Sequence, residues 1–150
     1  MDDKRNGRTV LVILIAATLC FIFYNSLQSG EDSGYRSFMV MRMLRPILEV
    51  FVGRGNVTLL LVRKLAHVFE FALLGLLLGT FALGINGART GVKLLCAYVS
   101  GQLCALLDET VQIFSHRGSS VADIWIDSLG VVLGVLLALA VYAISRKSNE

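Results

Sequence analysis

The amino-acid sequence predicts an all-α membrane protein: a bundle of four transmembrane helices, with one amphipathic helix in the membrane interface between the first and second spans. The chain has 150 residues, of which 55% are hydrophobic and only 17% are charged. Soluble domains have about 45–50% and about 25%, respectively. The apolar residues lie in long runs, and about 20 of them cross a hydrocarbon core about 30 Å thick. The linkers between the last three runs are short, so residues 1–150 are expected to form a single transmembrane domain.

The first span is expected at about residues 9–25, after a head that contains Lys4, Arg5 and Arg8. A charged head before a short apolar run is also the pattern of a secretory signal peptide. However, no small-residue cleavage site follows this run, because the chain continues Asn-Ser-Leu-Gln-Ser from Asn25. We therefore expect a retained first helix, with cleavage as the alternative.

The predicted interfacial helix lies at about residues 35–52, in the longest polar stretch of the chain. Its charged residues Arg42, Arg45 and Glu49 share one side at helical spacing, and bulky apolar residues share another. Such a pattern is typical of a helix in the membrane interface, although an ordinary packed surface helix also has it. Pro46 predicts a kink or break within the helix. The apolar side comprises Met39, Met43, Leu44, Ile47, Leu48 and Phe51.

The remaining spans are expected at about residues 57–83, 92–114 and 121–144. The basic residues are modestly more frequent on the side that would hold both chain termini, and cytoplasmic loops carry such an excess. We therefore expect a multi-pass membrane protein with both termini in the cytoplasm. The basic residues on that side are Lys4, Arg5, Arg8, Arg89, Lys93, Arg146 and Lys147.

With this orientation, the ionisable residues of spans two, three and four converge near the outer face of the bilayer. They lie in the first half of span two, the last two turns of span three and the first two turns of span four. Within each span, spacings of three, four or seven residues place them on a common helix face. The polar cluster predicted in this way comprises Arg63, Lys64, His67, Glu70, Asp108, Glu109, Gln112, Asp123 and Asp127, with Arg117 in the last linker.

The predicted cluster has two more carboxylates than fixed cations when its histidines are counted as neutral. A charged side chain at membrane depth costs about 2.5–3.5 kcal/mol on insertion scales. The acidic surplus therefore implies a bound cation, a protonated carboxyl group or a protonated histidine. Ion pairs that only hold the helices together are the alternative. Gly130 and Gly134 continue the face of Asp123 and Asp127, which predicts that span four meets another helix along this face.

At these residues the chain resembles the VanZ-like family over nearly its whole length. The motifs that carry the resemblance are Arg63-Lys64-Leu65-Ala66-His67 followed by Glu70-Phe71, and the run Asp108-Glu109-Thr110-Val111-Gln112-Ile113-Phe114. Arg117, Asp123 and the glycine-spaced helix follow in the family's order, and Ser26-Leu27-Gln28-Ser29 is also similar. The family usually has Asn where this chain has Asp127. The resemblance implies localisation in the bacterial cytoplasmic (inner) membrane. It also implies a link to reduced susceptibility to teicoplanin, a lipoglycopeptide that acts outside that membrane.

Three functions fit such a cluster. The first is binding of a membrane lipid or a lipid-linked envelope molecule, with the 35–52 helix as a lateral gate. Arg63, Lys64 and Arg117 would then meet an anionic headgroup, for which guanidinium groups are well suited. The alternative is membrane-embedded catalysis with His67 as a base, with or without a divalent cation. Ion-coupled transport is the third, and it has the least support because the cytoplasmic halves of the spans carry almost no ionisable side chains.

The sequence pattern predicts which residues form the site, but not the ligand or the reaction. No metal-ligand motif, no cofactor and no serine or cysteine nucleophile beside a base is evident, and scattered basic residues argue against nucleic acid as a partner. The sequence is also compatible with a homo-oligomer. The residues expected to bind are Arg63, Lys64, His67, Asp108, Glu109, Gln112, Arg117, Asp123 and Asp127. The candidates for catalysis are His67, Glu70, Asp108, Glu109 and Asp123.

Overall fold

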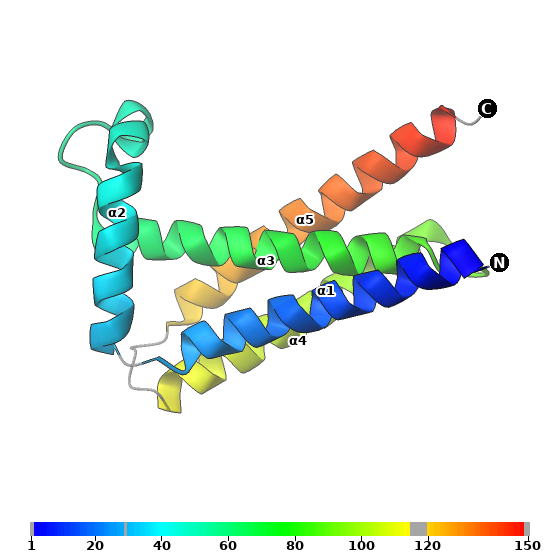
Figure 1. The fold of residues 1–150 in the computed structure, drawn as a ribbon, viewed down its shortest axis with the longest axis horizontal. Helices are drawn as coiled ribbons and strands as arrows, with labels where there is room; N and C mark the ends of the chain where they lie inside the picture. The colour runs from blue at the N-terminus through cyan, green and yellow to red at the C-terminus, as the bar shows by residue number, and fades with distance from the viewer. Residues whose placement is uncertain (1, 29, 115–119, 149–150) are drawn as a thin grey trace.

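The computed structural model describes residues 2–28, 30–114 and 120–148, and these ranges contain helices and no strands (Figure 1). Four of the helices are long and apolar enough to cross a membrane, which confirms the predicted all-α class and the four spans. The protein is therefore a multi-pass membrane protein. In chain order the helices are α1 (Asp2–Ser26), α2 (Gly30–Val52), α3 (Leu59–Leu83), α4 (Thr90–Phe114) and α5 (Val121–Lys147).

Helix α3 is the centre of the bundle, since it packs against each of the other four helices and most extensively against α5. Both chain termini lie at one end of the bundle, and α2 runs across the opposite end (Figure 1). Helix α4 ends and helix α5 begins at the same end as α2 (Figure 1). The polar halves of the three predicted spans are therefore at the end crossed by α2.

Helix boundaries follow local capping chemistry. The Thr58 hydroxyl accepts a hydrogen bond of 3.1 Å from the amide of Leu61 and so caps α3. Ser120 caps α5 in the same way, by accepting a bond of 3.1 Å from the amide of Ala122. Helix α2 begins at Gly30, earlier than predicted, and continues through Pro46 to Val52, so the helix does not break at this proline.

The contact between α3 and α5 depends on glycine. A Cβ atom added at Gly130 would lie 2.6 Å from the carbonyl oxygen of Val68, and one added at Gly134 would meet the carbonyl oxygen of Ala72. On α3, Gly79 faces α5, because a Cβ atom added at Gly79 would lie 2.8 Å from the Cβ of Ala138. The glycine face predicted on span four is thus confirmed, and its partner is span two. Close backbone approach through small residues is a common mode of helix packing in membranes.

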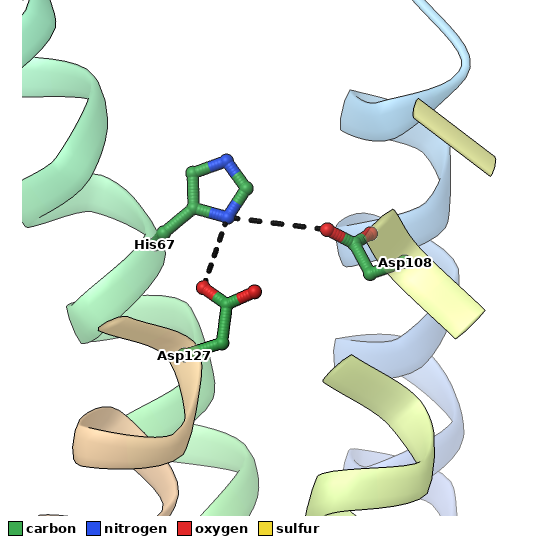
Figure 2. A group of neighbouring side chains, drawn as sticks. All are labelled: His67, Asp108 and Asp127. Atoms are coloured by element: carbon green, nitrogen blue, oxygen red, sulfur yellow. Dashed lines mark ion pairs between the residues drawn. The ribbon is translucent and has the colours of Figure 1, made fainter. Parts of the chain in front are cut away.

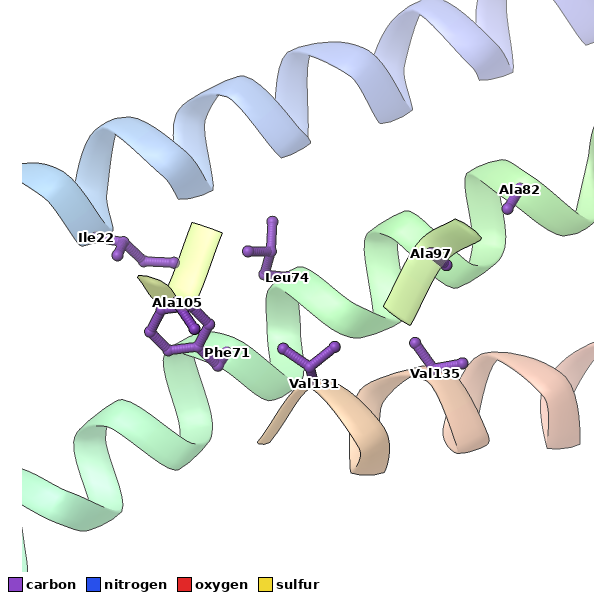
Figure 3. Close-up of a cluster of buried hydrophobic side chains, with 8 residues drawn as sticks. All are labelled: Ile22, Phe71, Leu74, Ala82, Ala97, Ala105, Val131 and Val135. Carbon is purple, nitrogen blue, oxygen red and sulfur yellow. The ribbon is translucent and has the colours of Figure 1, made fainter. Parts of the chain in front are cut away.

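The buried apolar core is small and lies where α1, α3, α4 and α5 meet (Figure 3). Many large apolar side chains on the four spanning helices face outward instead, among them Ile13, Phe69, Leu106 and Trp125, which are 45% or more exposed. Such an arrangement suits a bundle surrounded by lipid, where outward apolar groups meet hydrocarbon and not water. The core comprises Ile22, Phe71, Leu74, Ala82, Ala97, Ala105, Val131 and Val135.

Candidate functional site

A buried group of one histidine and two aspartates lies at the α2 end of the bundle, and each residue comes from a different helix. His67 on α3 approaches Asp127 on α5, with 3.3 Å between Nδ1 and Oδ1 (Figure 2). The same Nδ1 atom lies 3.9 Å from Oδ2 of Asp108 on α4. Both aspartates are 0% exposed. We call these three residues the His–Asp group.

The two aspartates differ in how they are satisfied. Asp108 accepts hydrogen bonds from the Ser26 hydroxyl on α1 and from Nε2 of Gln112, the latter at 2.7 Å. By contrast, neither carboxylate oxygen of Asp127 accepts a hydrogen bond from any described residue, nor does Nδ1 of His67 take part in one. The 3.3 Å approach of His67 to Asp127 therefore has the distance of an ion pair without the geometry of a hydrogen bond.

Helix α1 contributes to the site, which the sequence analysis did not predict. Besides the Ser26 contact, Nδ2 of Asn25 donates to Oε1 of Glu70 at 3.0 Å. The Ser26 hydroxyl adjoins Asp108, and since the Ser26 side chain is only 1% exposed, it is placed to position Asp108. The sequence signal that could have predicted this contribution is the polar pair Asn25 and Ser26, which ends the first apolar run.

The remaining predicted residues surround the His–Asp group. Nη2 of Arg63 donates to Oε1 of Gln112 at 3.4 Å, which links α3 to α4. Nearer the surface, Lys64 Nζ lies 3.6 Å from Oδ1 of Asp123. Glu109 is buried, and its Oε2 accepts a bond of 3.2 Å from the amide of Ser120, whereas its Oε1 accepts none from the described residues. Arg117 lies outside the described residues.

A small cavity of about 60 Å³ lies between α3, α4 and α5, and we call it the inner cavity. A buried site needs about 10–15 Å³ to hold one water molecule, so the inner cavity has room for an ion with water or for a small anion. Its ionisable lining has three carboxylates against two fixed cations. The lining residues are Leu60, Arg63, Lys64, His67, Glu109, Gln112, Asp123, Ile126 and Asp127.

A larger groove of about 350 Å³ lies between α1, α2 and α3, and we call it the α2 groove. Its ionisable lining is the reverse of that in the inner cavity, with Arg36 and Arg63 against the single carboxylate of Glu70. Arg63 and His67 line both spaces. The α2 groove is lined by Phe21, Asn25, Gln28, Ser33, Arg36, Ser37, Val40, Val62, Arg63, Ala66, His67 and Glu70.

Comparison with known proteins assigns the chain to a family. A family model described as VanZ/LLP1 matches residues 11–142, which is most of the chain. The chain belongs to the VanZ/LLP1 family. No match was found among curated proteins or among solved structures. The resemblance inferred from the motifs is therefore confirmed, and both of the main motifs of this VanZ/LLP1 protein, residues 63–71 and 108–114, lie within the matched range.

The site of this VanZ/LLP1 protein contains groups that can bind a cation and groups that can bind an anion. The His–Asp group can hold a cation or a proton between an imidazole and two carboxylates. Arg63 and Lys64, one helical turn toward the end of the bundle, can meet an anion. Asp123, which the sequence placed on the same face as Asp127, pairs with Lys64 and stays outside the His–Asp group.

Proposed function

We propose that this VanZ/LLP1 protein binds an amphiphile, a membrane lipid or a lipid-linked envelope molecule, by its anionic headgroup. The observation that carries the proposal is the α2 groove, which is apolar over much of its lining and has a basic excess at Arg36 and Arg63. Its volume of about 350 Å³ is near the lower end of small-molecule sites, about 300–1,000 Å³. A headgroup fits such a space, and acyl chains extend from it into the bilayer.

The two arginines of the groove come from different helices, which supports recognition of one anionic group from two sides. Arg36 lies over the ring of Tyr24, with 5.8 Å from its guanidinium carbon to the ring centre. Arg63 is held toward Gln112. Guanidinium groups donate paired hydrogen bonds to phosphate and carboxylate oxygens, so two preplaced arginines favour such a headgroup. The apolar residues Phe21 and Val62 supply a surface for the first methylene groups.

We further propose that α2 lies in the membrane interface and flanks the entrance to the groove as a lateral gate. Helix α2 crosses the end of the bundle (Figure 1), and many of its large apolar side chains are exposed. Met43, Val50 and Phe51 are each 80% exposed, which is costly in water and favourable at the boundary between headgroups and acyl chains. The basic residues Arg42 and Arg45 would then face lipid phosphates.

For the localisation, we propose the bacterial cytoplasmic membrane with both termini in the cytoplasm, so that the polar site faces outward. Both termini lie at one end of the bundle (Figure 1), where Arg89 directly precedes α4, Lys93 lies in the first turn of α4, and Arg146 and Lys147 lie in the last turn of α5. This basic excess supports the orientation. A C-terminal green fluorescent protein fusion should fluoresce and a C-terminal alkaline phosphatase fusion should be inactive. The reverse pattern would contradict the proposed orientation.

Headgroup binding is tested by native mass spectrometry of the purified protein with phosphatidylglycerol or phosphatidylcholine. We expect preferential retention of phosphatidylglycerol, with at least about a tenfold loss in Arg63→Gln, because hydrogen bonds to charged groups contribute about 1.5–3 kcal/mol. Arg36→Gln should weaken retention in the same direction. Arg89→Gln removes the same charge from an exposed position outside the groove, before α4 at the opposite end of the bundle, and should leave retention unchanged. Equal retention of the two lipids, or a wild-type result for Arg63→Gln, would contradict the proposal.

The proposed link to teicoplanin needs a separate test in cells. If the amphiphile contributes to glycopeptide action, expression of the wild-type protein should reduce susceptibility to teicoplanin, and Arg63→Gln should abolish this effect at equal expression. Equal susceptibility with and without the wild-type protein would contradict the link to teicoplanin while leaving the lipid-binding result to stand on its own.

A second candidate function is membrane-embedded catalysis, and the placement of His67 favours it. The imidazole lines the α2 groove, so a bound headgroup would be near it, and Asp108 lies 3.9 Å from Nδ1 on the other side. His67 would act as a general base oriented by this carboxylate. Release of headgroup from radiolabelled phospholipid by wild-type protein, lost in His67→Gln, would support this function. No turnover in either protein would exclude these lipids as substrates.

A further inference from the structure

Asp127 presents a problem that neither headgroup binding nor helix packing solves. Its side chain is 0% exposed, lies inside a membrane-spanning helix and accepts no hydrogen bond from the described residues. Buried carboxylates in proteins are normally hydrogen-bonded, paired or bound to a metal ion, because burial of an isolated charge is very costly. The atom nearest to it in the His–Asp group, Nδ1 of His67, also has no hydrogen bond to any residue that the structure describes.

The geometry points to a binding site for one zinc ion, formed by His67, Asp108 and Asp127. One ligand atom of each residue lies within 4.8 Å of those of the other two. Zinc bonds to imidazole nitrogen and carboxylate oxygen are about 2.0–2.2 Å long, so the ligand atoms of a tetrahedral site lie about 3.3–3.5 Å apart. The 3.3 Å between His67 and Asp127 already equals this spacing, and the 3.9 Å between His67 and Asp108 needs only a small side-chain rotation.

The type of ligand decides which ion fits. Calcium takes six to eight oxygen ligands, and magnesium keeps an octahedral shell of oxygens and water. One imidazole with two carboxylates is a ligand set for zinc and its first-row neighbours, and three protein ligands with one open position is the pattern of catalytic zinc sites. A dication would also neutralise the two buried carboxylates of the His–Asp group.

The surroundings of Asp108 resemble the supporting shell of a metal ligand. Ser26 and Gln112 both donate hydrogen bonds to this carboxylate and so fix its orientation. Figure 2 shows the Asp108 carboxylate turned toward His67. Such partners of metal ligands orient them and raise metal affinity by about 10–100-fold. The open fourth position would face the inner cavity, since His67 and Asp127 line it. This site does not depend on the α2 groove and is tested without lipid.

The experiment measures zinc bound to the purified protein in detergent, after EDTA treatment and removal of free metal. We expect one zinc ion per chain, and a loss of affinity of about 100-fold or more in His67→Gln and in Asp127→Asn. Asp123→Asn is the matched control, because it makes the same change one turn earlier on α5, in the lining of the same cavity but outside the His–Asp group. It should keep one zinc ion per chain.

Three results would overturn the zinc site: no stoichiometric zinc in the wild-type protein, unchanged binding in both ligand variants, or an equal loss in Asp123→Asn. Cobalt substitution tests the site in the wild-type protein, whether or not a variant folds. The visible absorption spectrum of the bound cobalt ion should have the bands of a four-coordinate site and no charge-transfer band from a cysteine thiolate. Thiolate bands would instead place the metal on the free cysteines Cys20, Cys96 or Cys104 and would also overturn the site. None of these outcomes bears on lipid retention, so the two proposals fail separately.

Discussion

The two halves of the α3–α5 helix pair are held in different ways. Toward the chain termini, Gly79 and Gly134 allow the backbones of α3 and α5 to approach closely. The contact there consists of backbone atoms and apolar side-chain atoms. Toward α2, the same helices place His67 against Asp127, and buried polar atoms of this pair have no hydrogen bond within the described part of the chain. We call these the glycine half and the polar half. One half is close-packed and satisfied, whereas the other holds groups whose burial costs free energy unless a ligand is bound.

This difference indicates that the two halves of the helix pair have different roles. Between helices in lipid there is little hydrophobic driving force, so close packing of small residues contributes much of the association. Ionisable groups at membrane depth are expensive and are usually functional. We interpret the glycine half as the support that keeps the helices together while the polar half stays incompletely satisfied. Substitutions at Gly134 and at Asp127 should therefore have opposite consequences for stability.

The largest effect is expected in the glycine half. Gly134→Ala places a methyl group against the carbonyl oxygen of Ala72 and the amide of Leu76, and backbone atoms cannot move aside as a side-chain end can. We expect the free energy of unfolding to fall by about 3 kcal/mol, at the upper end for overpacked sites. Unfolding in increasing SDS, followed by circular dichroism, measures this change.

The matched control is Gly91→Ala, also a helical glycine, where an added Cβ would meet nothing within 4 Å. Alanine is favoured over glycine in a helix by about 1 kcal/mol, so this variant should be as stable as the wild-type protein or slightly more stable. Equal stability of Gly134→Ala and Gly91→Ala would contradict the close packing of the glycine half.

The second effect tests the hydrogen bond between α1 and α4 that lies beside the polar half. Ser26→Ala removes the hydroxyl that donates to the buried carboxylate of Asp108 and should lower the free energy of unfolding by about 1–2 kcal/mol. Ser100→Ala, at an exposed position of α4, should have no measurable effect in the same SDS titration. If the two variants are equally stable, α1 is not tied to the polar half through this bond.

A smaller effect with a different sign is expected at Asp127. In metal-free protein, Asp127→Asn removes a buried charge that accepts no hydrogen bond from the described residues, so stability should stay the same or rise by up to about 1 kcal/mol. Excess zinc should raise the Tm of the wild-type protein and not that of the variant, since a ligand stabilises only the form that binds it. A clear loss of stability in metal-free Asp127→Asn would instead identify the His67–Asp127 pair as a structural ion pair.

Much of the fold was predictable from the sequence, because long apolar runs require spanning helices and helical spacing fixes which residues share a face. The glycine face of α5 was predicted for this reason, and the structure added that its partner is α3. Helical spacing has less power over depth. Asp123 and Asp127 share a face, yet only Asp127 is buried, because Asp123 lies in the first turn of α5 at the edge of the packed region.

The composition of the site was less predictable than its position. The ligand set of the His–Asp group comes from three helices, so no spacing within one segment signals it. Ser26 and Asn25 enter the site only because α1 packs against α3 and α4, and this arrangement depends on tertiary packing. Pro46 predicted a kink or a break, and the helix does not break there, because a helix can continue through proline where neighbouring groups compensate for the missing amide.

The smallest effect is expected at the rim of the polar half. Lys64 and Asp123 are 3.6 Å apart, with side chains 37% and 28% exposed. Exposed ion pairs contribute about 0–1 kcal/mol, because solvent screens them and pairing restricts two side chains. Lys64→Gln should therefore change the free energy of unfolding by less than about 0.5 kcal/mol in the SDS titration. A loss as large as that of Ser26→Ala would move the boundary of the polar half outward to include this pair, and the rim would then belong to the structural support of the site.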